Sequence, residues 1–193
     1  MRTAVLAVIG AISLVAYGCG GGGGNSSGNG ATSQVPGQPD SSGQTEDAYG
    51  NGHPITLSTM NEDNLETESE VVRIVNEHRV SLGKNALIST QGLAEVARAH
   101  SMHMTIHSFF AHQNPEGDSP GQRILKGGIL WSIAGENLAA GFSTPEAAFV
   151  AWMNSPGHKD NIERDDWVFT GVGIWKESTS EYGTYYTQNF CRP

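Results

Sequence analysis

The sequence has only two cysteines, Cys19 and Cys191, among its 193 residues. Small secreted domains that are held together by disulfides carry several cysteine pairs, so the chain is not a scaffold of that kind. Basic residues are also scarce, since 11 Lys and Arg stand against 20 Asp and Glu and give a formal net charge of −9. A nucleic-acid-binding surface needs clustered basic residues, and here they are scattered. Composition therefore excludes nucleic acid as a partner and disfavours anionic lipid surfaces.

Charged side chains are missing from much of the first third of the chain, and large apolar ones are nearly absent from Gly20 to Pro54. No Asp, Glu, Lys or Arg occurs between Thr3 and Pro39, and Gly, Ser, Asn and Gln dominate after Cys19. Such a segment cannot bury enough apolar surface to offset its chain entropy. We predict a disordered Gly/Ser-rich spacer over residues 19–64. Residues 65–193 remain for folding, which is enough for one domain with a proper interior.

The N-terminus has the features of a secretory signal. Arg2 supplies one positive charge, and an apolar run over 4–16 follows that is too short for a secure membrane span. The run ends at Ala16-Tyr17-Gly18-Cys19, which looks like a bacterial lipobox. We predict a signal peptide over 1–18, lipidation of Cys19 and anchoring in the cell-envelope membrane, with ordinary cleavage or an uncleaved anchor as alternatives. In a host with two membranes, Gly20 after the cysteine favours the outer membrane.

Helical periodicity dominates the first half of the domain. Thr67-Glu68-Ser69-Glu70 has the spacing of a capping box and predicts a helix that continues to about Leu82. A second helix is predicted from about Thr90 to His107, a short one around 123–125, and one behind Thr144-Pro145 that ends at Pro156-Gly157. Extended segments are predicted over 129–139, 167–175 and 183–190, the last two linked as a hairpin. This order predicts an α+β fold with helices packed on a mainly antiparallel sheet.

Short motifs follow one another in order through this domain. They are Phe109-Phe110-Ala111-His112, Gly135-Glu136-Asn137-Leu138-Ala139, Ala151-Trp152-Met153-Asn154-Ser155-Pro156-Gly157-His158, Asn161-Ile162, Gly171-Val172-Gly173 and Tyr186-Thr187-Gln188-Asn189-Phe190. In this order and spacing they resemble the bacterial branch of the CAP family (cysteine-rich secretory proteins, antigen 5 and pathogenesis-related 1; SCP-like domains). The resemblance covers the whole of 65–193 and implies a three-layer α-β-α sandwich. We expect a monomeric, secreted domain.

The resemblance also implies a cleft lined by two histidines and two glutamates. His112, Glu136 and His158 match three of these positions, and Asn137 lies beside them in the motif. Where other branches carry the second glutamate, this chain reads Met153-Asn154-Ser155. Glu146 lies six residues before Trp152, nearly two helical turns away, so the role is not transferred to it.

Three interpretations of this residue set stay open. The side chains could form a hydrogen-bonded structural network. His112 and His158 could bind zinc or another divalent cation, with Glu136 nearby. Glu136 could act as a base in a metal-assisted hydrolase of peptides or wall polymers that also uses both histidines. No nucleophile stands out, so no catalytic residue is assigned. We favour a non-enzymatic surface module that binds a small apolar ligand such as a lipid, an envelope component or a protein.

A second group of histidines lies on the helix predicted over 90–107. His100, His103 and His107 are spaced three and four residues apart, close to one face. Pairs of metal ligands use such spacing, but the glutamate of helical zinc proteases is missing. His100 and His107 share their arc with Leu93 and Val96, so we expect packing residues here.

Overall fold

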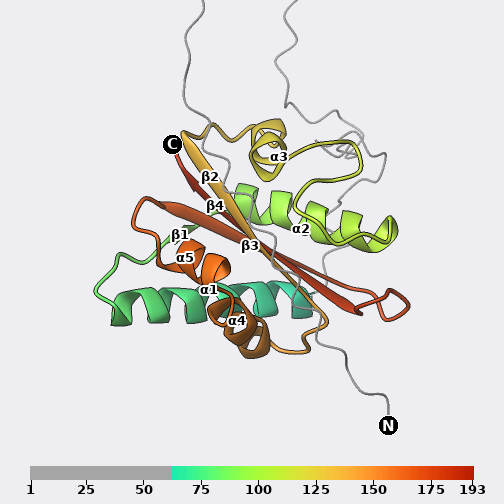
Figure 1. Cartoon of the computed structure of the whole chain (residues 1–193), viewed down its shortest axis with the longest axis horizontal. Helices are drawn as coiled ribbons and strands as arrows, with labels where there is room; N and C mark the ends of the chain where they lie inside the picture. The colour runs from blue at the N-terminus through green and yellow to red at the C-terminus, as the bar shows by residue number, and fades with distance from the viewer. Residues whose placement is uncertain (1–61) are drawn as a thin grey trace, which may run out of the picture.

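The computed structural model of the protein describes residues 62–193, with side chains from Asn64 onward (Figure 1). The predicted signal peptide, Cys19, and the predicted spacer up to residue 61 lie outside the described residues. None of the described helices is both long and apolar enough to cross a membrane.

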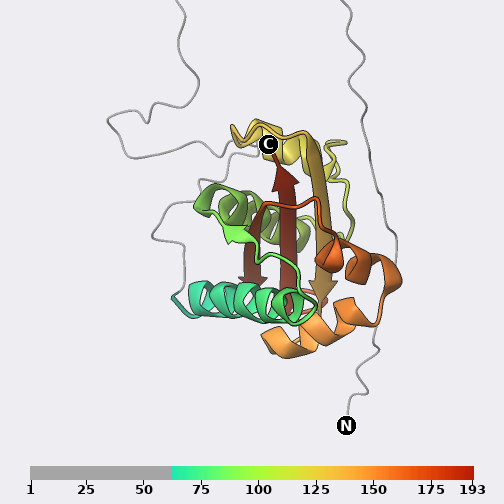
Figure 2. The same ribbon diagram turned by 90° about the vertical axis from the view of Figure 1, so that its left-hand side faces the viewer.

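A four-stranded sheet forms the middle of the domain, with strand order β1-β3-β4-β2. Strand β1 (Ile88–Ser89) pairs with β3 (Phe169–Lys176) in parallel, whereas β4 (Thr184–Arg192) pairs antiparallel with both β3 and β2 (Ile133–Ala140). Helices α1 (Glu62–Ser81), α4 (Pro145–Met153) and α5 (Pro156–Glu163) cover one face, and α2 (Gln91–Ile106) and α3 (Pro120–Lys126) cover the other (Figures 1 and 2). The predicted three-layer α-β-α sandwich with a mainly antiparallel sheet is confirmed.

Glycines let α2 lie directly on the sheet. A Cβ atom added to Gly171 would come within 2.3 Å of the backbone of α2, and one added to Gly173 within 1.9 Å. Any larger residue would have to push the helix away. The glycines of the Gly171-Val172-Gly173 motif therefore serve helix–sheet packing, while Val172 between them is buried on the opposite face.

Apolar side chains fill both spaces between helices and sheet. The larger cluster, beneath α1, α4 and α5, includes Val71, Val75, Trp152, Ile162, Trp167, Val172, Ile174, Tyr186 and Phe190. Beneath α2 and α3, Leu93, Val96, Ile124 and Cys191 form one cluster, and Met104, Leu138 and Tyr185 form another. Cys191 is a buried free thiol, and its burial raises its pKa.

Side chains of α4 and α5 bond to the backbone of β2, the strand at one end of the sheet. The indole of Trp152 donates to the carbonyl of Leu138 at 2.9 Å, and the amide of Asn161 donates to the carbonyl of Glu136 at 3.2 Å. Because an exposed edge strand invites pairing with another chain, these contacts protect it. They also fix both helices against the strand that carries the Gly-Glu-Asn motif.

The predicted start of the first helix is wrong. Helix α1 begins at Glu62, inside the predicted spacer, and Thr67 lies within it. The carboxylate of Glu70 binds Arg73 one turn later, whereas Glu68 is buried and forms two hydrogen bonds to Arg98 on α2. The two glutamates of this stretch thus form ion pairs, Glu70 at the surface and Glu68 in the interior, and do not mark the start of the helix.

Helix α5 is absent from the sequence prediction, which treats Pro156-Gly157 only as the end of the preceding helix. Proline has no N–H to donate and its φ suits the first helical position, so it also starts helices. Pro156 does so here and opens α5 directly after α4. The predicted cap at Thr144 is confirmed, because its side chain accepts a hydrogen bond from Ala147 N. Thr90, predicted as the approximate start of the second helix, caps α2.

Candidate functional site

Glu136 sits on β2 with its carboxylate turned toward α2 and α3, and its side chain is 1% exposed. One oxygen, Oε1, is 2.9 Å from Nδ1 of His112, and the other, Oε2, accepts a 2.5 Å hydrogen bond from Arg123. Burial alone would raise the pKa of Glu136, but the charge of Arg123 and the hydrogen bond with His112 outweigh it and lower the pKa to about 2. Glu136 is therefore a buried carboxylate with both oxygens engaged.

Arg123, on α3, is a member of this site that sequence reasoning did not find. Its side chain is 3% exposed, and besides Glu136 it binds two backbone carbonyls through Nη1, that of His112 at 2.6 Å and that of Asp118 at 3.0 Å. Helix α3 holds it in place through a full capping box between Ser119 and Gln122. The only sequence signal was an arginine among the apolar residues of a short predicted helix.

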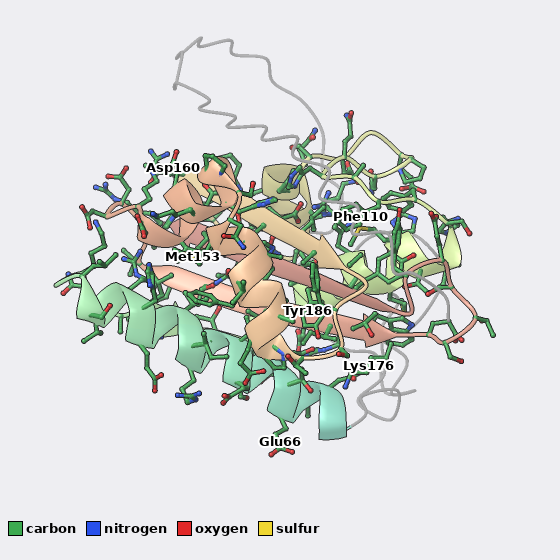
Figure 3. All side chains as sticks on the ribbon, turned by 60° about the horizontal axis from the view of Figure 1, so that its bottom comes forward. Glu66, Phe110, Met153, Asp160, Lys176 and Tyr186 are labelled. Carbon is green, nitrogen blue, oxygen red and sulfur yellow. The ribbon has the colours of Figure 1, made fainter. Side chains whose placement is uncertain are left out.

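His112 follows the Phe109–Ala111 segment in irregular backbone, and its side chain is 17% exposed. The contact with Glu136 uses Nδ1, so Nε2 is the ring nitrogen that remains for other partners. Phe110, two residues earlier, packs on Tyr182 and Tyr185 at centroid distances of 5.8 and 6.4 Å and anchors the segment (Figure 3).

His158 lies near the start of α5, on the opposite side of the sheet. The amide of Asn137 holds this helix by donating to the carbonyl of His158 at 3.1 Å, and Asn161 in turn donates to Asn137 Oδ1 at 3.0 Å. Gly135 completes the motif, since a Cβ there would meet the ring of Trp167 at 2.9 Å. Asn137, predicted as a binding residue, is fully buried, so it holds α5 rather than facing a ligand.

The two imidazoles lie within electrostatic reach of one another. Burial, and secondly the proximity of His112, lower the pKa of His158 to about 4. The three predicted side chains are thus linked, His112 to His158 by this electrostatic effect and His112 to Glu136 by a hydrogen bond. Figure 3 labels Phe110 and Asp160, which mark the two segments that supply the histidines.

The same three residues do not form a three-ligand metal site. Within the described part of the chain, no group of three or more His, Cys, Asp and Glu is arranged to hold a metal ion. Both oxygens of Glu136 are bound by Arg123 and His112. Its contact with His112 instead fits the outer carboxylate that orients a ligating imidazole through the other ring nitrogen. Of the three side chains, only the two imidazoles are left as candidate ligands for a cation.

Packing is confirmed for His100 and His103, which are buried on α2, but not for His107, which follows the helix and is exposed. His100 is buried, donates from Nε2 to the carbonyl of Ala111 at 3.0 Å and has its pKa lowered to about 3, first by burial and then by the charge of Arg123. His103 packs against Phe109 and His107, with ring centroids 5.2 and 4.4 Å apart. His100 thus supports the backbone just before His112.

A polar pocket of about 420 Å³ lies elsewhere, between the first turns of α1, the start of α4 and the end of β3. Glu66, Thr67, Glu70, Pro145 and Lys176 line it; Figure 3 labels Glu66 and Lys176. None of its lining residues belongs to the histidine site. Its charges are mixed, and Glu70 is already paired with Arg73.

A profile of the cysteine-rich secretory protein family, CAP, matches residues 72–190. The chain belongs to the CAP family. Protein YkwD of Bacillus subtilis strain 168 is 38% identical over 123 residues, which are 64% of this chain and 46% of YkwD. The membrane protein YlbC of the same organism is 32% identical over 126 residues, which are 65% of this chain and 34% of YlbC. The chain thus matches less than half the length of these curated CAP relatives.

Solved structures give the same fold. An extracellular protein with an SCP domain from Bacillus anthracis Ames superposes with a TM-score of 0.64 at 30% identity, covering 73% of this chain and 45% of that one. An outer surface protein of Borrelia burgdorferi has a TM-score of 0.58 at 24% identity, covering 66% of this chain and 92% of that one, a likeness that concerns the fold alone.

Proposed function

We propose that this CAP domain is a non-enzymatic, extracellular binding module and that His112 and His158 contact its ligand. The observation that carries the proposal is the state of Glu136, whose side chain is 1% exposed and bound on both oxygens. A general base must reach the substrate and have a pKa near the working pH. A carboxylate with a pKa of about 2 beneath two other side chains meets neither condition.

Of the two imidazoles, that of His112 is the better placed to meet a ligand, because its side chain is 17% exposed. His158 is 6% exposed, and it is neutral at pH 7 because its pKa is about 4. Neutral imidazoles donate and accept hydrogen bonds and also bind borderline cations such as zinc. The ligand class that follows is a small apolar or lipid-like molecule, another envelope component or a protein surface, with a divalent cation as a bridging partner.

Native mass spectrometry of the full-length protein purified from its own envelope tests this proposal. We expect a bound ligand or metal in the wild type and its loss in the double variant His112→Ala, His158→Ala. Assays with peptides and cell-wall polymers run in parallel, with and without zinc. Turnover of any of these substrates by the purified wild type would contradict the proposal and favour the hydrolase.

We also propose that Cys19 carries a lipid anchor and that the spacer holds the domain away from the membrane. The lipobox-like sequence supports this, and the relative from Bacillus anthracis is described as an extracellular protein. In a bacterial expression host grown with a labelled fatty acid, the wild type should carry the label and Cys19→Ser should not. An unlabelled wild type, or equal labelling of the two, would contradict lipidation at this position.

A further inference from the structure

Arg123 is joined to His112 by two routes. It binds the backbone carbonyl of His112 directly, and it binds Glu136, which in turn binds the ring of His112, so the contacts close a loop. We propose that Arg123 is a positioning residue that fixes His112 in the tautomer with hydrogen on Nδ1 and leaves the Nε2 lone pair for the ligand. The proposal deepens the proposed function and rests on it.

The tautomer follows from donor and acceptor roles. The guanidinium of Arg123 carries only donors, so Glu136 must accept through Oε2. An ionised carboxylate has no hydrogen to give through Oε1 either, and the 2.9 Å contact with His112 Nδ1 therefore needs a hydrogen on that nitrogen. In a neutral ring, Nε2 then carries the lone pair. This is the arrangement in which an outer carboxylate prepares an imidazole to act as an acceptor or metal ligand.

The geometry also requires arginine in particular. One guanidinium presents its donors in a rigid planar fork, so Nη1 and Nη2 can hold the His112 backbone and Glu136 at the same time. A lysine would offer one compact ammonium on a flexible stem. Without Arg123, Oε2 of Glu136 and the backbone carbonyl of His112 would both lose the donor that ties them together. The carboxylate and the imidazole would then no longer be held in fixed register.

The ring nitrogens of His112 report the tautomer directly in ¹⁵N NMR spectra of the full chain at pH 8. The wild type should show hydrogen on Nδ1 and a bare Nε2, and Arg123→Met should lose this pattern. The matched control is Arg98→Met, which breaks the buried ion pair between Arg98 and Glu68. That pair does not touch His112, so the control should keep the wild-type ¹⁵N pattern. A wild-type ring with hydrogen on Nε2, or an unchanged pattern in Arg123→Met, would overturn the proposal.

A second variant covers the case in which Arg123→Met does not fold. Arg123→Lys keeps the charge but cannot hold both partners, so its affinity for zinc, used alone as a probe of the bare Nε2, should fall about 10–100-fold in calorimetry. An affinity equal to that of the wild type would overturn the positioning role. A wild type that shows the expected tautomer and binds no zinc would support the positioning role and remove the cation from the proposed function.

Discussion

Glu136 and Asn137 are neighbours on β2, yet they serve opposite layers of the sandwich. Glu136 points toward α2 and α3 and joins a charged network with Arg123 and His112. Asn137 points toward α5 and joins a neutral network of amides and carbonyls with Asn161 and the backbone of His158. Two adjacent residues of one strand thus hold the two histidines from opposite sides. The comparison shows that a single motif can position a site whose halves come from different layers.

Substitutions in the two networks should lower the free energy of unfolding by different amounts. Removing one partner of a buried ion pair leaves an uncompensated charge, whereas removing one amide leaves neutral groups unsatisfied.

The largest effect is expected for Glu136→Gln, which leaves Arg123 buried without its anionic partner. The free energy of unfolding should fall by about 3–5 kcal/mol in urea titrations. Glu66→Gln, an exposed carboxylate on α1, is the control and should leave stability unchanged. A loss in Glu136→Gln as small as in the control would mean that the ion pair contributes nothing.

A smaller loss is expected for Asn137→Ala, because the carbonyl of His158 and the amide of Asn161 each lose a neutral partner. The free energy of unfolding should fall by about 1–3 kcal/mol. The exposed Asn85→Ala serves as the control. If Asn137→Ala were more destabilising than Glu136→Gln, the ranking of the two networks would be wrong.

Mild acid should weaken the domain through its buried histidines. The folded-state pKa values of His158, about 4, and His100, about 3, lie below the ordinary value of 6.5. The unfolded chain therefore takes up protons first, and this stability is fully present above pH 6.5 and lost as pH falls toward 4. Urea midpoints measured from pH 7 to pH 5 should fall in the wild type and fall less in His158→Asn. Equal slopes would contradict the lowered pKa of His158.

Much of the fold could be predicted because its signals are local. Threonine before a helical pattern, glycine after one and alternation in the last two strands depend on neighbours in the sequence. The start of α1 could not be predicted in this way. The apparent capping box at Thr67–Glu70 contains Glu68, which binds Arg98, 30 residues later in the chain. The start of α5 was hidden because proline both ends and begins helices.

The residues of the site also differ in whether the sequence alone could identify them. His112, Glu136 and His158 were found through motifs, but the motifs do not say what each side chain binds. Arg123 is 13 residues from Glu136 in sequence, and its other partners are backbone carbonyls. Every residue has a backbone carbonyl, so the sequence does not indicate which ones Arg123 binds. The face of the sheet toward which the Asn137 side chain points likewise depends on the pairing of β2 with β4. Contacts of this kind need the folded chain.

The proposed function depends on Glu136 being a permanently ionised anchor and not an acid or base. A ¹³C NMR titration of its side-chain carboxyl carbon in the full chain measures this directly. We expect the carboxyl group to stay ionised from pH 8 down to the acid unfolding of the domain, in line with a pKa of about 2. A titration midpoint between pH 5 and 8 would contradict it and would return Glu136 to the role of a proton-transferring group.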